Sequence, residues 1–148
     1  MAGRTDFVYS SQPESLLEDG DFVARIPSGL ASKHELLETL SEVAAFPGYF
    51  GRNWDALVDC LRDFGWIENR RVVLVHDDLP LRNDPAECRT YIDVLKGVLE
   101  DWATNPEPGS FVSTPDWPNV ARDLVVVFPP ETMASIDFIL KLIQRRRS

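Results

Sequence analysis

The chain has 148 residues, of which 44% are hydrophobic and 26% are charged, and its formal net charge is −9. A chain of this length can bury a substantial core without metals or disulfides, so we expect one folded domain over residues 1–148. The charge and the sequence pI near 4.6 argue against a general nucleic-acid-binding protein, which would carry a basic stripe. The same charge suits a cationic partner, although it would also simply keep a protein soluble.

The N-terminus and the cysteines favour a cytoplasmic protein. No apolar core follows the first six residues, as a signal peptide would require, and no apolar run approaches membrane-spanning length. Cys60 and Cys88 both fall in predicted helices and are interpreted as buried, inert thiols in a reducing compartment. We therefore expect no membrane association.

The first third of the chain predicts an arm, a strand and a helix. Residues 1–20 are weakly patterned and predict an N-terminal arm, in which residues 7–9 could add a short strand. Residues 21–26 predict the first firm strand, which is stopped by Pro27 and Gly29. Ser32 and Glu35 have the spacing of a capping box at the start of a helix. The expected core face of this helix is Leu36, Leu37, Leu40, Val43 and Ala44.

Residues 46–63 predict a helix stop, a tight loop and a new helix. Pro47 cannot continue a helix, and Gly51 supplies a backbone that can bend either way. Asn53 is the expected N-cap of the new helix, and Gly65 stands where a C-cap is common. The apolar stripe of the new helix is expected to be Trp54, Leu57, Val58 and Leu61.

The opposite side of this helix carries Asp55, Asp59 and Asp63, one helical turn apart. Like charges at this spacing cost a helix roughly 0.2–0.5 kcal/mol per pair, so the acidic ladder is unusual. Two interpretations stay open, a solvated helix face and a binding face. The helix dipole favours Asp55 in the first turn, and Arg52 and Arg62 are expected to neutralise part of the ladder.

The second half of the chain predicts two more strands and two more helices. Residues 71–75 and 122–128 predict strands, because 72–75 and 124–128 are continuous apolar runs, as in strands buried on both faces of a parallel sheet. Residues 85–103 and the C-terminal segment 131–148 have helical periodicity, with the last helix over 133–144. The expected inward residues are Cys88, Tyr91, Ile92, Leu95, Val98, Leu99 and Trp102 in the first of these helices and Met133, Ile136, Ile139, Leu140 and Ile143 in the second.

Two loops invite a functional interpretation. His76, Asp77, Asp78 and Asp84 follow a strand end and could hold a divalent metal, although a polar loop with Asp turns is the favoured interpretation. Residues 104–121 form a long loop, which is either functional or lies flat with Phe111 and Trp117 against the core.

The order of elements predicts an α/β fold, with three parallel strands joined by right-handed crossovers and packed with helices. The C-terminal helix and the long loop would be additions to this unit. No zinc spacing or glycine-rich phosphate loop is present, so we expect neither a metal nor a cofactor.

The pattern Tyr49-x-Gly51-x-Asn53-x-Asp55-Ala56-Leu57-x-Asp59-Cys60-Leu61 resembles the barstar family of intracellular ribonuclease inhibitors. The resemblance implies that the loop and helix plug the cationic active site of a barnase-type ribonuclease. Asp59 would occupy the place of the substrate phosphate, and Asp55 would make a second charged contact. Tyr49 would pack on the catalytic histidine, Gly51 would let the loop approach closely, and Asn53 would support the site.

The implied partner is a basic secreted or injected ribonuclease, and the implied role is to protect the producing cell as an immunity protein or antitoxin. Glu100 or Asp101 could join the binding surface. This chain differs from the family in having Arg52 where an acid is usual and Val58 in place of a tryptophan. Two other functions remain open: a barstar-fold module for a different basic partner, and an enzyme that uses Asp55 and Asp59.

Overall fold

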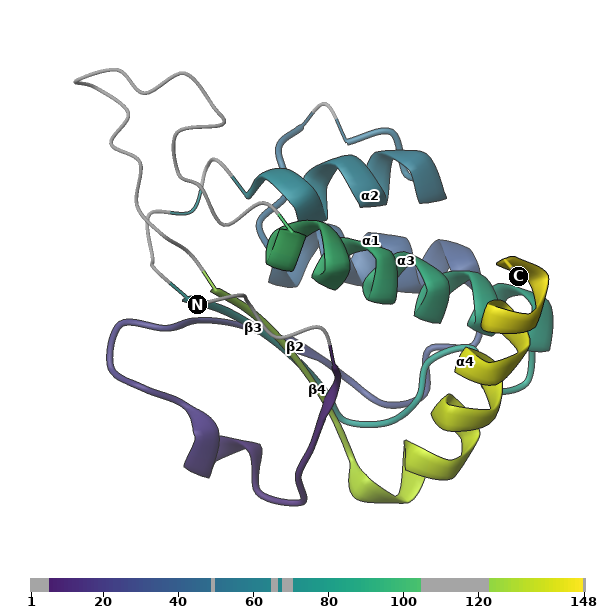
Figure 1. The fold of residues 1–148 in the computed structure, drawn as a ribbon. Helices are drawn as coiled ribbons and strands as arrows, with labels where there is room; N and C mark the ends of the chain where they lie inside the picture. Colours follow the sequence, from purple (N-terminus) through teal and green to yellow (C-terminus); the bar gives the residue numbers. More distant parts are fainter. Residues whose placement is uncertain (1–5, 49, 65–66, 68–70, 105–122, 148) are drawn as a thin grey trace.

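The structure is a computed structural model that describes residues 6–48, 50–64, 67, 71–104 and 123–147. One sheet forms its centre, with helices α1 (Lys33–Val43), α2 (Trp54–Asp63) and α3 (Pro85–Thr104) on one side (Figure 1). The chain around the short 3-10 helix η1 (Pro13–Leu16) lies on the other side. Helix α4 (Met133–Arg147) follows the 3-10 turn η3 (Pro130–Thr132) and packs beside α3. The α/β fold class is thus confirmed.

All strands of the sheet are parallel, in the order β1-β4-β3-β2. The three predicted strands are present as β2 (Phe22–Ile26), β3 (Arg71–His76) and β4 (Asp123–Phe128). The expected strand count of three is wrong, because β1 (Val8–Tyr9) adds a fourth at the outer side of β4. Without β1, the apolar strand β4 would be an open sheet edge, which natural proteins usually cover or pair.

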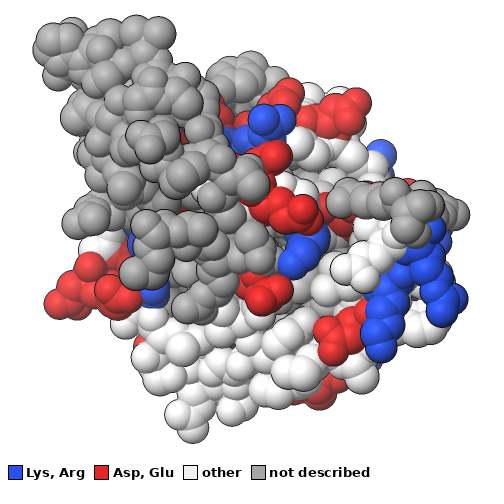
Figure 2. All heavy atoms as spheres, viewed as in Figure 1, with Lys and Arg blue, Asp and Glu red and all other residues white. Residues whose placement is uncertain are grey.

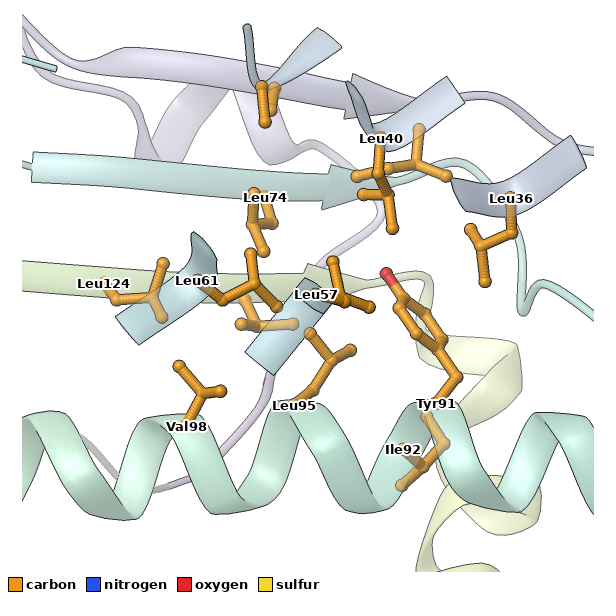
Figure 3. Packing of buried hydrophobic residues seen from close by; sticks show 14 of the residues in the cluster. Leu36, Leu40, Leu57, Leu61, Leu74, Tyr91, Ile92, Leu95, Val98 and Leu124 are labelled. Atoms are coloured by element: carbon orange, nitrogen blue, oxygen red, sulfur yellow. The ribbon is translucent and has the colours of Figure 1, made fainter. Parts of the chain in front are cut away.

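The core lies on both faces of the sheet, as the β-branched runs predicted. On the helical face, leucines of α1, α2 and β3 meet the inward side of α3 (Figure 3). The other face is a cluster of four valines, Val73, Val75, Val125 and Val127, covered by Val8, Leu16 and Leu17. The N-terminal arm therefore has a structural role, since it closes the second face.

The helix starts agree with the capping signals. The Ser32 hydroxyl accepts a hydrogen bond from the Glu35 N–H at 3.1 Å, which confirms Ser32 as the N-cap, and it donates to the Glu35 carboxylate at 3.2 Å. In α4, Ile136 and Ile143 are buried as expected, but Met133 is 42% exposed. The inward prediction for Met133 is wrong, because this first residue of α4 follows the η3 turn directly and faces solvent.

Arg71 at the start of β3 fastens the N-terminal arm to the sheet. Its guanidinium binds the Asp21 carboxylate through Nε at 3.1 Å and Nη2 at 2.9 Å. Nη2 also donates to the Leu16 carbonyl at 2.6 Å, and Nη1 pairs with Glu18 at 2.8 Å. The Asp21 side chain is only 5% exposed, so this is a buried ion pair that holds the cover of the valine cluster.

A buried polar pair joins β3 to α3. The His76 Nδ1 lies 3.0 Å from the Val127 carbonyl, and Nε2 lies 2.6 Å from the Tyr91 hydroxyl. A carbonyl only accepts, so Nδ1 carries the proton and Tyr91 donates to Nε2. The ring stacks on Phe128 with centroids 4.0 Å apart. Burial lowers the pKa of His76 from 6.5 to about 4, against the opposing effect of the bond to Val127.

This pair makes stability depend on pH above the range in which carboxylates titrate. The folded state keeps His76 neutral, whereas the unfolded chain takes up a proton near pH 6.5, so acid favours unfolding. We expect the free energy of unfolding to fall as pH drops from 6.5 toward 4, by up to about 1.4 kcal/mol per pH unit. Urea unfolding between pH 7 and pH 5 measures the slope.

His34, the chain's other histidine, is exposed and provides the control. The slope should survive in His34→Gln and disappear in His76→Gln. A slope that persists without His76 would contradict the assignment.

Candidate functional site: the acidic face of α2

The loop between α1 and α2 is anchored by aromatic side chains. Helix α1 ends at Val43, earlier than the predicted stop at Pro47, because Ala45 adopts a positive φ of 54°. Phe46 and Phe50 then pack with ring centroids 4.9 Å apart, and Phe50 is 8% exposed. The residues that follow the loop are therefore held against the core.

The start of α2 is confirmed, but the bend of the loop lies one residue later than expected. The Asn53 side-chain oxygen accepts a hydrogen bond from the Ala56 N–H at 2.8 Å, as an N-cap does. Arg52, not Gly51, has the positive φ, at 53°. A Cβ on Gly51 would lie 3.3 Å from the Asn53 amide nitrogen, so the glycine matters here for close approach to the cap.

Helix α2 presents its acidic ladder to solvent. Asp55, Asp59 and Asp63 are all exposed, and none of them forms an ion pair with a described residue. The expected neutralisation is wrong, because both neighbouring arginines have other partners. Arg52 pairs with Glu38 of α1, and Arg62 pairs with Asp101 of α3 at 3.2 Å.

The opposite side of α2 holds the helix rigidly. Leu57 and Leu61 are fully buried and point toward β3 and α3 (Figure 3), and Cys60 is 4% exposed. The Trp54 indole donates to Glu87 at 3.2 Å, and the Trp102 indole donates to the Leu61 carbonyl at 3.1 Å. The four residues predicted as the apolar stripe thus include two fully buried leucines. The other two, Trp54 and Val58, are half-buried.

The two indole bonds were not foreseen from the sequence. The sequence pattern predicts only that a tryptophan at an inward position packs its ring against the core. The hydrogen-bond partner of its N–H depends on the angle at which α2 crosses α3. Both hydrogen bonds join α2 to α3, one at each end of α2. They therefore hold the helix that carries the acidic face in a fixed position.

The two cysteines are free and buried, as predicted. Burial raises the pKa of the Cys60 thiol, and the carboxylates of Asp63 and Asp59 add to this effect. Burial also raises the pKa of Cys88 to about 11. Neither thiol is therefore a ready nucleophile at neutral pH.

The possible metal site after β3 is not assembled. His76 uses both ring nitrogens in the core, and Asp77 pairs with Arg25 at 2.8 Å. Asp78 binds Arg82, and Asp84 accepts from the Glu87 N–H at 3.3 Å as the cap of α3. Across the described ranges, no group of three or more His, Cys, Asp or Glu side chains could hold a metal ion.

Some predictions fall outside the described residues. Tyr49 and Gly65 are among these positions, as are residues 105–122 with Phe111 and Trp117. The C-cap of α2 is Phe64, one residue before the predicted Gly65. Phe64 has a positive φ of 47°, and its N–H donates to the Cys60 carbonyl at 3.0 Å.

Comparison with protein-family models gives a match to Barstar (barnase inhibitor) over residues 22–113, which is well over half of the chain. The protein belongs to the barstar family. This is a family of inhibitors, not of enzymes. Searches of the curated proteins and of the solved structures found no match. Among the described residues, no helix is long and apolar enough to cross a membrane.

The barstar-family match covers the acidic face and its supports, since it runs from β2 through α1, α2, β3 and α3. Strands β1 and β4 and helix α4 lie outside it. The family assignment thus rests on the part of the chain that carries the predicted binding residues.

Proposed function

We propose that this protein is a cytoplasmic inhibitor that blocks the cationic active site of a barnase-type ribonuclease, and so protects the cell that makes the ribonuclease or receives it. Asp59 accepts hydrogen bonds from active-site arginines in the place of a substrate phosphate, and Asp55 makes a second charged contact. Tyr49, Gly51 and Asn53 complete the binding surface. The enzyme has no access to RNA while this surface covers its active site.

One observation carries the proposal: three exposed carboxylates on α2 lack ion-pair partners among the described residues, although two arginines stand next to them in sequence. Pairing those arginines with Glu38 and Asp101 leaves the ladder available for an external cation. Carboxylate–guanidinium bonds are strong and directional, so such a face suits an arginine-rich active site. The family match to a barnase inhibitor agrees with this chemistry.

Titration of the protein into a barnase-type ribonuclease tests the proposal. We expect RNA cleavage to fall linearly to zero at one equivalent of inhibitor. The association rate should drop steeply between low and physiological salt. Salt screens the attraction between this protein, with its net charge of −9, and a basic enzyme. Undiminished cleavage at a large excess of inhibitor would contradict the proposal for this class of enzyme.

A different basic partner is the second candidate, and it would use the same face. Arg52, 56% exposed at the head of α2, and the half-buried Val58 both differ from the family pattern. If barnase-type enzymes are not inhibited, binding of another basic toxin that depends on Asp59 would support this candidate. An enzymatic role has less support, since the family model that matches the chain describes an inhibitor.

A further inference from the structure

Arg52 is a basic residue inside the proposed binding surface. It lies between Gly51 and Asn53, at the turn where the loop enters α2, and it is exposed. Its φ of 53° is in the left-handed region, which is costly for a residue with a Cβ. The neighbouring Gly51 would adopt this conformation at less cost. The strained turn at Arg52 therefore needs support from the contacts of its side chain.

The Arg52 side chain reaches back to helix α1. Its Nε forms an ion pair with the Glu38 carboxylate, which is 34% exposed and so only partly screened by water. Glu38 belongs to a helix turn that is held firmly, since Leu37 and Leu40 on either side of it in sequence are buried in the core. The ion pair therefore fixes the guanidinium on α1, away from the acidic ladder of α2.

A released Arg52 side chain would have Asp55 as the next acid along the chain. Asp55 lies three residues further on, in the first turn of α2, and forms no ion pair with a described residue. Figure 2 shows acidic and basic side chains side by side over the helical part of the molecule, so several acids are available to a mobile cation. A tethered guanidinium competes with an external one at a high effective concentration.

We propose that Glu38 is a positioning residue of the inhibitory face: it holds Arg52 on α1 and thereby keeps Asp55 open to the cations of the partner. Glu38 acts through Arg52 and needs no contact with the ribonuclease. Without it, the chain's own guanidinium takes the place of the partner's at Asp55. This inference rests on the proposed inhibition and deepens it, because it explains how a basic residue is tolerated inside the binding surface.

A double-mutant cycle on binding to a barnase-type ribonuclease tests the role of Glu38. The control for Glu38→Ala is Glu42→Ala, which removes an exposed carboxylate one turn further along α1. Both variants lose one negative charge, so they share any effect of the overall field. We expect the dissociation constant of Glu38→Ala to be about fivefold higher than that of Glu42→Ala, because an Arg52–Asp55 pair would be an exposed one.

The second arm of the cycle removes the competing cation. Arg52→Ala should tighten binding about fivefold in the Glu38→Ala background and much less in the unaltered chain, although the charge change is the same in both. A purely structural role of Glu38 would not be rescued in this way. Equal urea midpoints of Glu38→Ala and Glu42→Ala exclude a loss of fold.

NMR of the free protein tests the inference without a ribonuclease. The Arg52 Nε–H signal should shift in Glu38→Ala. Adding Asp55→Asn should shift it again in that background, whereas Asp55→Asn should leave it in place in the unaltered chain. A signal that ignores Asp55 in both backgrounds, or equal affinities of Glu38→Ala and Glu42→Ala, would overturn the inference while inhibition stands. If no variant inhibits, the proposed function fails for this class of enzyme, and the spectra still decide whether Glu38 holds Arg52.

Discussion

Asp59→Ala is expected to weaken binding to the target ribonuclease by about 2–5 kcal/mol, which is the range for truncating one partner of a buried interfacial charge pair. That range is known in part from the barnase–barstar complex itself, so it is an expectation for a family member and not a derivation. Most of the loss should arise in the dissociation rate, because the arginines of the enzyme stay buried without their partner. Surface plasmon resonance or stopped-flow competition measures both rates.

The matched control is Asp137→Ala, which removes an exposed carboxylate from α4. Both variants change the net charge by the same amount, so any effect of the overall field on association is shared. The fold should tolerate both, since surface substitutions usually change stability by about ±0.5 kcal/mol or less. Equal binding by the two variants would show that α2 is only a solvated face.

Arg71→Ala is expected to cost about 3–5 kcal/mol of stability, the usual loss when one partner of a buried ion pair is removed. The variant leaves the Asp21 carboxylate buried with only the Glu18 N–H at 2.8 Å as a described hydrogen-bond donor. It also frees the Leu16 carbonyl and the chain that covers the valine cluster. Urea unfolding should show a lower midpoint, and a dye that binds apolar surfaces should report the uncovered valines.

Arg25 on the neighbouring strand β2 offers a close control. It also forms two ion pairs, with Glu14 and Asp77 at 2.8 Å each, but its side chain is 54% exposed. Exposed pairs add little to stability, so the urea midpoint of Arg25→Ala should stay close to that of the unaltered protein. A matching loss in both variants would mean that the number of ion pairs matters and their burial does not.

Local signals in the sequence located the helices and the inner strands well. The caps at Ser32 and Asn53 each accept from a backbone N–H three residues further on, and both are present as expected. The runs in β3 and β4 are apolar at nearly every position, which only a strand covered on both faces requires.

Features set by distant contacts were harder to predict. Whether residues 7–9 pair with a strand depends on β4, more than a hundred residues away in the chain. Arg52 and Arg62 stand three residues from aspartates, yet their partners lie on α1 and α3. Local spacing could not reveal this, because the packing of α2 against its neighbours decides which acid each guanidinium reaches.

For the same reason, the acidic face was visible in the sequence but its availability was not. The residues Asp55, Asp59 and Asp63 could be placed on one side of a helix by counting. That they lack ion-pair partners among the described residues follows only from where the arginines go. The contacts of the five predicted binding residues with a ribonuclease stay a prediction.

The position of β4 between β1 and β3 constrains the order in which the protein can fold. The last strand of the chain, β4, occupies an inner position of the sheet. Strand β1 therefore cannot pair, through Val8 and Val127, until β4 has been added. Contacts so far apart in sequence form late and slow the search for the native state. During synthesis, an almost complete chain would still expose the valines of the second sheet face. A chaperone that shields apolar segments would then raise the yield of native protein.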